Sequence, residues 1–480
     1  MYLCRNIYSL NSEVMHVEQL YTNCLSEAAY FIASDGEAAV IDPLRDVEVY
    51  LEKAEKMGVK IKYIFETHFH ADFVSGHLEL AKKTGAPIVY GPQTKANFPI
   101  LLATDGEEFS IGKLKLKAMH TPGHTLESTC YVLNDENGAP YCVFTGDTLF
   151  VGDVGRPDLF SGNMTKEELA SMMYDSLQKV KELPGNVIVY PAHGPGSSCG
   201  KNLGPETFST IAAQKENNYA LQDMEREEFV KAVTSGLSTP PAYFPINARI
   251  NKEGYTTMDE VMETAMQPLS VEEFKSKVED GAWILDTRPA TVFTLAFVPD
   301  SISIGLDGRF AEWAGSLLPY HQPLVLVTEP GKEQESIIRL ARVGIDNVQG
   351  YLEGGVEAWK AAGEEIDMII DIEADELAMD IPHDHKLEVI DVRKTTEFDG
   401  GHVKGAVNVP LDTLTDVANI AAVDMDNNLY IHCAGGYRSV IAASLFKRQG
   451  YDNLRNVLGG FAKMKQVKSM PIVTPKAHGV

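Results

Sequence analysis

Short apolar segments that end in polar turns alternate with helical stretches along the first half of the chain. Between about residues 30 and 190 they read AYFIASDGEAAVIDP, VKIKYIFETHFH, PYCVFTGDT and GNVIVYPAHG. Histidines or aspartates follow directly after several of these segments. This pattern predicts an α/β sandwich in which the strand ends present polar side chains on short loops at one edge.

The pattern changes at STPPAYFP, where prolines interrupt regular structure. We predict a first domain over residues 1–232 and a linker or strap over residues 233–267. Beyond it, an offset of 105 residues aligns ILDTRPATVFTLAFVPDSISIGLDG, from Ile284, with VIDVRKTTEFDGGHVKGAVNVPLDT, from Val389. The repeat predicts two copies of one small parallel α/β domain, over residues 268–366 and 373–470.

The composition of the chain limits the classes of partner that it can bind. A formal net charge of −26 disfavours nucleic acid and anionic membranes. The opening residues MYLCRNIYSLNSEV lack the order of a secretory signal, and we find no window of about 18 uninterrupted apolar residues. Six cysteines are scattered without paired spacing. We therefore expect a cytoplasmic protein that acts on small molecules and has free thiols rather than disulfides.

Candidate metal ligands follow the strands of the first half. THFHAD supplies two histidines and an aspartate on one turn, and TPGHT, FTGD and YPAH each supply one residue more. Imidazole and carboxylate groups are common metal ligands. The sequence therefore predicts a metal site drawn from His68, His70, Asp72, His124, Asp147 and His193.

The order HxHxD, PGHT, TGD and PAH resembles the metallo-β-lactamase superfamily over roughly the first 230 residues. The resemblance implies an αββα sandwich. Hydrolases of that superfamily usually continue the first motif as HxHxDH, but here this position is Phe73, which cannot donate to a metal. The difference favours a mononuclear site over a dinuclear zinc site.

Within the superfamily, the motifs are most similar to those of persulfide dioxygenases. That resemblance implies one Fe(II) per chain, held by His68, His124 and Asp147, and no organic cofactor. Two histidines and one carboxylate are a recognised arrangement for non-heme iron. The remaining three candidates are His70, Asp72 and His193. They would orient the iron ligands or form a residual zinc site.

Four further residues are candidates for the substrate pocket. GDVGRPDLF resembles a family loop, which would place Arg156 and Asp158 beside the metal; the alternative for Arg156 is a structural ion pair. Tyr190 resembles a family tyrosine near the substrate; the alternative is a core aromatic residue. Cys199, in GPGSSCGK, could meet the substrate sulfur; the alternative is an inert buried thiol.

The second repeat contains a candidate nucleophile. LYIHCAGGYRSVIAASL predicts a buried strand, then Cys433, a glycine-rich turn and a helix. The N–H groups of such a loop, together with Arg438, would stabilise a thiolate or persulfide on Cys433. The segment resembles the rhodanese sulfurtransferases, whose loops also have four residues between the cysteine and the arginine. The predicted sulfur-binding loop comprises Ala434, Gly435, Gly436, Tyr437 and Ser439.

The first repeat lacks this chemistry. The same offset places Thr328 at the position of Cys433 and Glu333 at the position of Arg438. Without a thiol, and with carboxylates that repel an anion, this copy cannot carry a persulfide in the same way. We predict a rhodanese-like domain with a structural or docking role, or one that shapes a shared channel.

The order of the domains resembles bacterial fusions of a persulfide dioxygenase with rhodaneses. This implies oxidation of a low-molecular-weight persulfide by O2 to sulfite and the free thiol, and transfer of sulfur from Cys433 to sulfite to give thiosulfate. It also implies a homodimer or homotetramer. The carrier thiol stays open between glutathione, coenzyme A, bacillithiol and cysteine. The alternatives are that Cys433 loads persulfides for oxidation, or that a glyoxalase II-like zinc thioester hydrolase is fused to a sulfur-carrier module.

Overall fold

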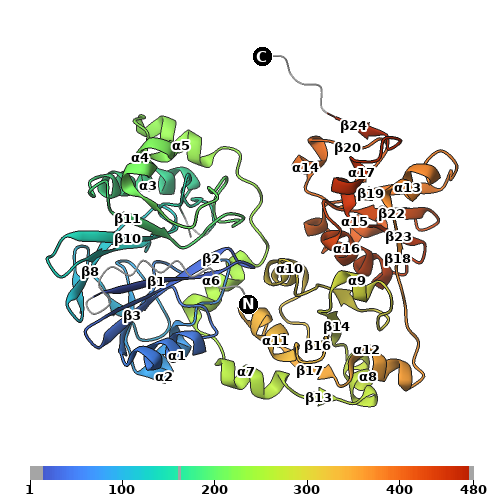
Figure 1. The fold of residues 1–480 in the computed structure, drawn as a ribbon, viewed down its shortest axis with the longest axis horizontal. Coiled ribbons are helices and arrows are strands. Elements are labelled where there is room, and N and C mark those ends of the chain that lie inside the picture. Colours follow the sequence, from blue (N-terminus) through green and yellow to red (C-terminus); the bar gives the residue numbers. More distant parts are fainter. Residues whose placement is uncertain (1–14, 160–163, 475–480) are drawn as a thin grey trace. The chain divides into compact units, whose positions relative to one another are not determined.

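A computed structural model describes residues 15–159 and 164–474, and the chain divides into two compact units (Figure 1). The first unit comprises residues 1–258 with 341–344, and the second comprises residues 259–340 with 345–480. Among the residues described, no helix has the length and apolar character needed to cross a lipid bilayer.

Two six-stranded sheets form the first unit. The first sheet has the strand order β1 (His16–Thr22), β2 (Glu27–Ser34), β3 (Glu37–Ile41), β4 (Lys60–Phe65), β5 (Ile88–Tyr90) and β6 (Leu101–Leu102). The second has the order β12 (Ser209–Thr210), β11 (Ile188–Pro191), β10 (Pro140–Gly146), β9 (Thr129–Asn134), β8 (Leu114–His120) and β7 (Glu108–Ile111).

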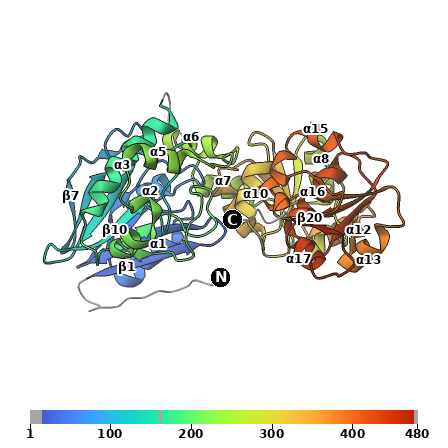
Figure 2. The same cartoon turned by 90° about the horizontal axis from the view of Figure 1, so that it is seen from above.

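Apolar side chains from both sheets meet in one buried core, which includes Ile32, Phe65 and Phe144. The outer face of the first sheet packs on α1 (Glu48–Met57) and α2 (His77–Thr84), and that of the second on α3 (Lys166–Lys181) and α5 (Arg226–Thr234). Figure 1 shows this order of layers, and Figure 2 shows α3 and α5 side by side. Helix α4 (Ile211–Asn217) follows β12. The layers are those of the αββα sandwich that the sequence predicts.

The segment predicted to be a linker or strap contains two helices, α6 (Phe244–Glu253) and α7 (Met258–Ala265). Helix α6 belongs to the first unit and carries the fully buried Asn251. The amide nitrogen of Asn251 donates to the carbonyls of His70 (2.8 Å) and Phe73 (2.7 Å), and its oxygen accepts from the N–H of Ser75 (2.8 Å). One side chain therefore holds the HFHADF turn from a position about 180 residues later in the chain.

The second unit contains two five-stranded sheets with the same order of strands. In chain order, their parallel strands are β13 (Pro268–Leu269), β14 (Trp283–Asp286), β15 (Ile302–Ser303), β16 (Leu324–Val327) and β17 (Val348–Leu352), then β18 (Ile370–Ile372), β19 (Leu387–Asp391), β21 (Val407–Asn408), β22 (Asn428–His432) and β23 (Leu454–Val457). β20 (His402–Val403) pairs with β24 (Ile472–Val473) apart from them. The helices of the first copy are α8 (Val271–Glu279), α9 (Ala290–Phe293), α10 (Phe310–Leu317), α11 (Glu333–Ala341) and α12 (Gly355–Ala361), and those of the second are α13 (Ala374–Asp380), α14 (Thr395–Asp399), α15 (Val417–Ala421), α16 (Tyr437–Arg448) and α17 (Gly460–Met464).

A buried ion pair recurs in the two copies at the predicted offset of 105. Arg393 binds both carboxylate oxygens of Asp391 and donates to the carbonyl of Gly401 (2.8 Å). In the first copy, Arg288 binds Asp286 in the same way and donates to the carbonyl of Ala296 at 2.9 Å. Each arginine ties the end of a central strand to the turn after the next helix, so the pair braces the fold in both copies.

Arg393→Leu should destabilise the second repeat by about 3–5 kcal/mol, because it leaves the buried Asp391 carboxylate without a partner. Denaturant-dependent hydrogen exchange on the full chain would measure the loss at β19 and β22. The matched control is Lys332→Gln, which removes a half-exposed pair with Glu335 and should cost less than about 1 kcal/mol. Similar losses in the two variants would contradict a buried structural pair.

Candidate metal centre and thiol loop

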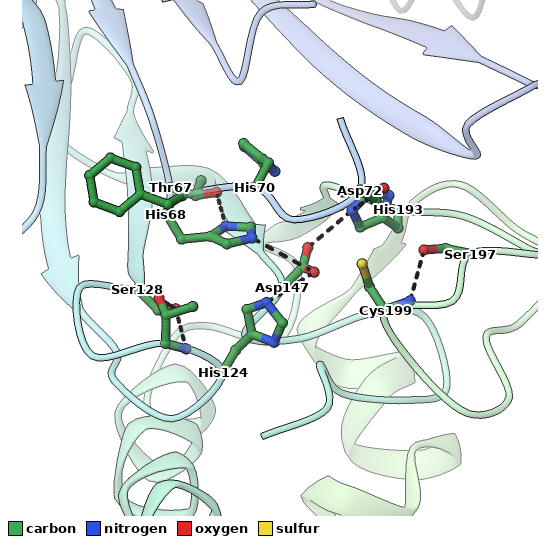
Figure 3. A network of polar contacts seen from close by, with 12 residues as sticks. Thr67, His68, His70, Asp72, His124, Ser128, Asp147, His193, Ser197 and Cys199 are labelled. Carbon is green, nitrogen blue, oxygen red and sulfur yellow. Dashed lines mark hydrogen bonds and ion pairs between the residues drawn. The ribbon is translucent and has the colours of Figure 1, made fainter. Parts of the chain in front are cut away.

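Three side chains from separate loops converge at one edge of the sandwich. His68 follows β4, His124 lies between β8 and β9, and Asp147 follows β10. All three are at most 2% exposed, and one potential ligand atom from each lies within 4.8 Å of the others. Figure 3 shows them pointing toward a common space.

Hydrogen bonds fix which nitrogen of each histidine faces that space. Thr67 donates its hydroxyl proton to Asp42 (2.9 Å), so its oxygen accepts from Nδ1 of His68 (2.9 Å). Nδ1 of His124 donates to the carbonyl of Arg156 at 2.9 Å. The free lone pairs are therefore on the Nε2 atoms, which lie 3.8 Å (His68) and 3.4 Å (His124) from Oδ2 of Asp147.

The electrostatics suit a cation at this place. Both carboxylate oxygens of Asp147 are buried and have no hydrogen-bond partner among the described residues. A buried carboxylate without compensation is costly, and a metal ion would supply the missing charge. Burial and the neighbouring imidazoles lower the pKa of His68 well below its ordinary value, so the ring is in the neutral form that binds metals. The three residues thus fit a metal ion.

A second group adjoins the first through Asp147. Nε2 of His193 lies 3.5 Å from Oδ1 of Asp147 and 3.4 Å from Asp72, and its Nδ1 contacts the carbonyl of Ser26 at 3.2 Å. His70, Asp72 and His193 also present ligand atoms within 4.8 Å of one another. These residues could hold a second ion or orient groups around the first.

His70 has a second set of partners on its other side. Its Nε2 lies 3.0 Å from Asp42 and 3.5 Å from Glu66. Burial by itself would lower the pKa of His70, but these two carboxylates raise it well above its ordinary value. The fully buried Phe73 ring lies 4.3 Å from the His70 ring, between centroids. His70 is therefore built into a buried acid–imidazole cluster, which favours a supporting role over a metal ligand.

The thiol loop lies in the second repeat, between β22 and α16. Sγ of Cys433 accepts from the N–H of Gly436 at 3.1 Å, and Gly436 has a φ of 109°, a conformation that glycine adopts easily. Cys433 is 2% exposed. Arg438, one residue into the helix, forms a bidentate pair with Glu397 at 2.7 and 2.9 Å. The loop has the strand–turn–helix geometry that the sequence predicts.

The corresponding loop of the first repeat is filled by its own carboxylate. Thr328 follows β16, and the N–H of Gly331 donates to the side chain of Glu333 at 3.2 Å. In the second repeat the equivalent turn donates to the sulfur of Cys433. The two repeats therefore differ in the group that this turn N–H binds, and the loss of sulfur chemistry in the first repeat stays a prediction.

Two known families match the chain. The metallo-beta-lactamase superfamily matches residues 22–193, and the rhodanese-like domain matches residues 270–362 and 373–466. The metallo-beta-lactamase of Staphylococcus aureus subsp. aureus COL is 30% identical, and the match covers 71% of this chain and 99% of that one, with a TM-score of 0.63. The chain belongs to the metallo-β-lactamase superfamily. The predicted fold, a metallo-β-lactamase sandwich followed by two rhodanese-like domains, is confirmed.

Other relatives bear different names. The hydroxyacylglutathione hydrolase of Brucella ovis is 34% identical over 183 residues, which are 37% of this chain and 66% of that relative. ETHE1 from Myxococcus xanthus is 30% identical, with a match that covers 49% of this chain and 99% of that one and a TM-score of 0.42. The matches establish two enzyme-family folds and leave the reaction open.

The four pocket candidates of this metallo-β-lactamase domain lie in different surroundings. The side chain of Arg156 is buried and forms an ion pair with Asp158 at 2.7 and 2.9 Å. The contact of Arg156 with His124 is made by its backbone carbonyl. Tyr190 packs its ring against Tyr30 and Phe144 in the core between the sheets. The pocket roles of Arg156, Asp158 and Tyr190 stay predictions.

Cys199 lies at the metal site. Its sulfur is within 4.8 Å of ligand atoms of Asp147 and His193, and it points toward them in Figure 3. Burial, followed by the charges of Asp72 and Asp147, raises the pKa of Cys199 well above its ordinary value. The residue therefore presents a neutral thiol to the metal pocket.

Sequence reasoning missed the residues that hold the metal ligands. Thr67 and Asp42 orient His68, Glu66 contacts His70, and Asn251 binds the turn that carries His70. The sequence could have pointed to two of these residues, because Asp42 ends the apolar segment AAVID and Glu66 directly precedes THFHAD. No such signal pointed to Asn251, because it acts from a distant helix.

Gly146→Ala should weaken metal binding about tenfold or more without removing a ligand. An added Cβ would lie 2.5 Å from Oγ1 of Thr67, the atom that orients His68, and loss of such supporting contacts typically costs that much. Metal titration against a chromophoric chelator would measure it. Gly138→Ala is the control, since Gly138 also has a positive φ (80°) but has nothing within 4 Å of the added carbon. Equal affinities in the two variants would exclude this role of Thr67.

Proposed function

We propose that the chain is a persulfide dioxygenase coupled to a sulfurtransferase. The observation that carries the proposal is the set of two imidazoles and one carboxylate, His68, His124 and Asp147, beside a phenylalanine at position 73. Such a set favours one non-heme iron(II), whereas a dinuclear zinc site would gain from a further histidine at that position.

The overall reaction balances as a persulfide, O2 and water giving a thiol, sulfite and two protons. An iron(II) at this site would supply open coordination positions for dioxygen and a substrate sulfur. The chain's own groups keep the site dry and hold the two ligand imidazoles in one tautomer. His193, between Asp72 and Asp147, is suited to accept a proton released by the substrate.

The rhodanese-like domain supports the second step. A persulfide on Cys433 would place its outer sulfur in the loop beside the N–H of Gly436. Sulfite attacks this sulfur, the S–S bond to Cys433 breaks, and thiosulfate leaves while Cys433 becomes a thiolate. The second site would thus consume the product of the first.

A second candidate is zinc-dependent thioester hydrolysis. It is favoured by the adjoining group His70, Asp72 and His193, which could hold a second ion next to Asp147, and by the name of the Brucella relatives. Two metal ions with a shared carboxylate would generate a hydroxide nucleophile. This candidate leaves the thiol loop as a sulfur carrier.

The deciding experiment is anaerobic purification of the full chain, with iron and zinc counted per chain. The dioxygenase predicts one iron, and oxygen uptake with glutathione persulfide or coenzyme A persulfide. Two zinc ions, cleavage of S-lactoylglutathione and no oxygen uptake would instead establish the hydrolase and end the leading proposal.

His193→Ala separates the two candidates by metal count. In a mononuclear site, His193 is not a ligand, so one iron per chain should remain while oxygen uptake falls about 100-fold, the scale of a lost acid–base group. In a dinuclear site, the count should fall from two to one. His124→Ala is the matched change within the first group and should abolish iron binding.

Cys433→Ser should leave oxygen uptake unchanged and move the product from thiosulfate to sulfite, because serine cannot carry the sulfane sulfur. Ion chromatography of the products would measure the ratio. Cys142→Ser, at a fully buried cysteine of the first unit, controls for the loss of a thiol as such. Thiosulfate that persists in Cys433→Ser would refute the coupling.

A further inference from the structure

A chain of hydrogen bonds connects the silent rhodanese-like domain to Cys433. The hydroxyl of Thr294 donates to Oδ2 of Asp371 at 2.6 Å, and Nδ2 of Asn456 donates to Oδ1 of the same carboxylate at 2.7 Å. Oδ1 of Asn456 accepts from the hydroxyl of Ser439 at 2.7 Å. The oxygen of Ser439 lies 3.7 Å from the sulfur of Cys433.

The carboxylate gives this chain a direction. An ionised Asp371 only accepts hydrogen bonds, so the amide nitrogen of Asn456 must face it and the amide oxygen must face Ser439. The hydroxyl proton of Ser439 therefore points to Asn456, its nearest acceptor, although the carbonyl of Gly436 is also within 3.1 Å. A lone pair of Ser439 is left toward the sulfur, where it can accept from an S–H but cannot donate to an anion.

The chain is shielded from water at both ends. Thr294 is 1% exposed, Asn456 is 2% exposed and Ser439 is fully buried. Asp371, in the middle of the chain, is partly exposed. Water cannot easily reach the buried hydroxyl of Ser439, so a change passed along the chain must be felt there.

The silent domain also contacts the thiol loop directly. The hydroxyl of Tyr437 donates to the carbonyl of Gly305 at 2.7 Å, and a Cβ on Gly308 would lie 2.3 Å from the Tyr437 ring. A cavity of about 240 Å³ opens between the two domains, and its lining includes Thr291, Thr294, Asp371, Gly436, Tyr437 and Asn456. The first repeat, which has no thiol of its own in the loop, thus forms one wall of the second repeat's site.

We propose that the silent domain is a positioning part of the Cys433 site. Through Thr294, which donates to Asp371 of the second repeat, it helps to fix the direction of the Ser439 hydroxyl, so that Ser439 holds Cys433 as a thiol and opposes the N–H of Gly436, which favours the anion. The inference rests on the proposed sulfurtransferase role of Cys433. It assigns to Thr294 and Asp371 a function that neither domain has alone.

Other charged groups lie around Cys433, and all of them except Asp371 are common to the variants. From the neighbouring loops, strands and helices, the titratable and charged groups are Asp307, Asp371, Asp391, Arg393, Glu397, His432, Arg438 and Lys463. Arg438 favours the thiolate, but its charge is shared with Glu397. Thr294→Val changes no charge, so its effect reports on the hydrogen-bond chain alone. Asp371→Asn also removes a negative charge, and that loss by itself favours a thiolate.

The test is the pH dependence of Cys433 alkylation by iodoacetamide, followed by mass spectrometry on the full chain. Asp371→Asn is isosteric and offers an N–H to Asn456, which lets that amide turn and lets Ser439 donate to the sulfur. The midpoint should fall by about 0.5–1 pH unit. Thr294→Val removes only the hydrogen bond from Thr294 to Asp371, so the midpoint should fall by less.

Thr291→Val is the matched control, since this neighbouring threonine lines the same cavity and is not a member of the chain. Its midpoint should equal that of the unchanged protein. A midpoint that stays constant or rises in Thr294→Val would overturn the proposal, because Asp371→Asn lowers the midpoint through its lost charge even without the chain. Alkylation needs no sulfur transfer, so a midpoint shift without thiosulfate formation in any protein would support the positioning role and reject the sulfurtransferase.

Discussion

The first unit depends on the charge of one buried carboxylate. Asp147 has both oxygens inside the protein without a hydrogen-bond partner among the described residues, and three imidazoles are arranged around it. Such a charge is tolerated only where a cation compensates it. The surrounding contacts keep the imidazole lone pairs directed at that place. The hydroxyl oxygen of Thr67 accepts a hydrogen bond from Nδ1 of His68, and the carbonyl of Arg156 accepts one from Nδ1 of His124.

This constraint explains why the supporting residues come from several elements. A histidine can bind the metal only while its coordinating nitrogen faces the metal position. Each ligand ring is therefore held by a hydrogen bond at its other nitrogen. The glycine of the TGD motif leaves room for Thr67, and Asn251 fixes the turn that carries His70 from a helix outside the sandwich layers. The site is therefore as much a property of packing as of its ligands.

The second unit uses one fold twice for two purposes. Both copies keep the strand order and the buried aspartate–arginine pair, so the fold does not depend on the thiol loop. The loops differ in their residues and in what their N–H groups bind, a sulfur in one copy and the carboxylate of Glu333 in the other. The first copy also contacts the loop of the second at Tyr437, and Asp371 through Thr294.

The sequence by itself determined the order of folds, the repeat, the six candidate metal ligands and the Cys433 loop, because each rests on local patterns of strand, turn and ligand spacing. Only the tertiary structure decided which ring nitrogens face Asp147, that His70 belongs to the Asp42–Glu66 cluster, and that Asn251 and Thr294 support sites far away in the chain. These contacts join residues that no periodic pattern relates. They arise when separately formed elements pack and their buried polar groups must find partners.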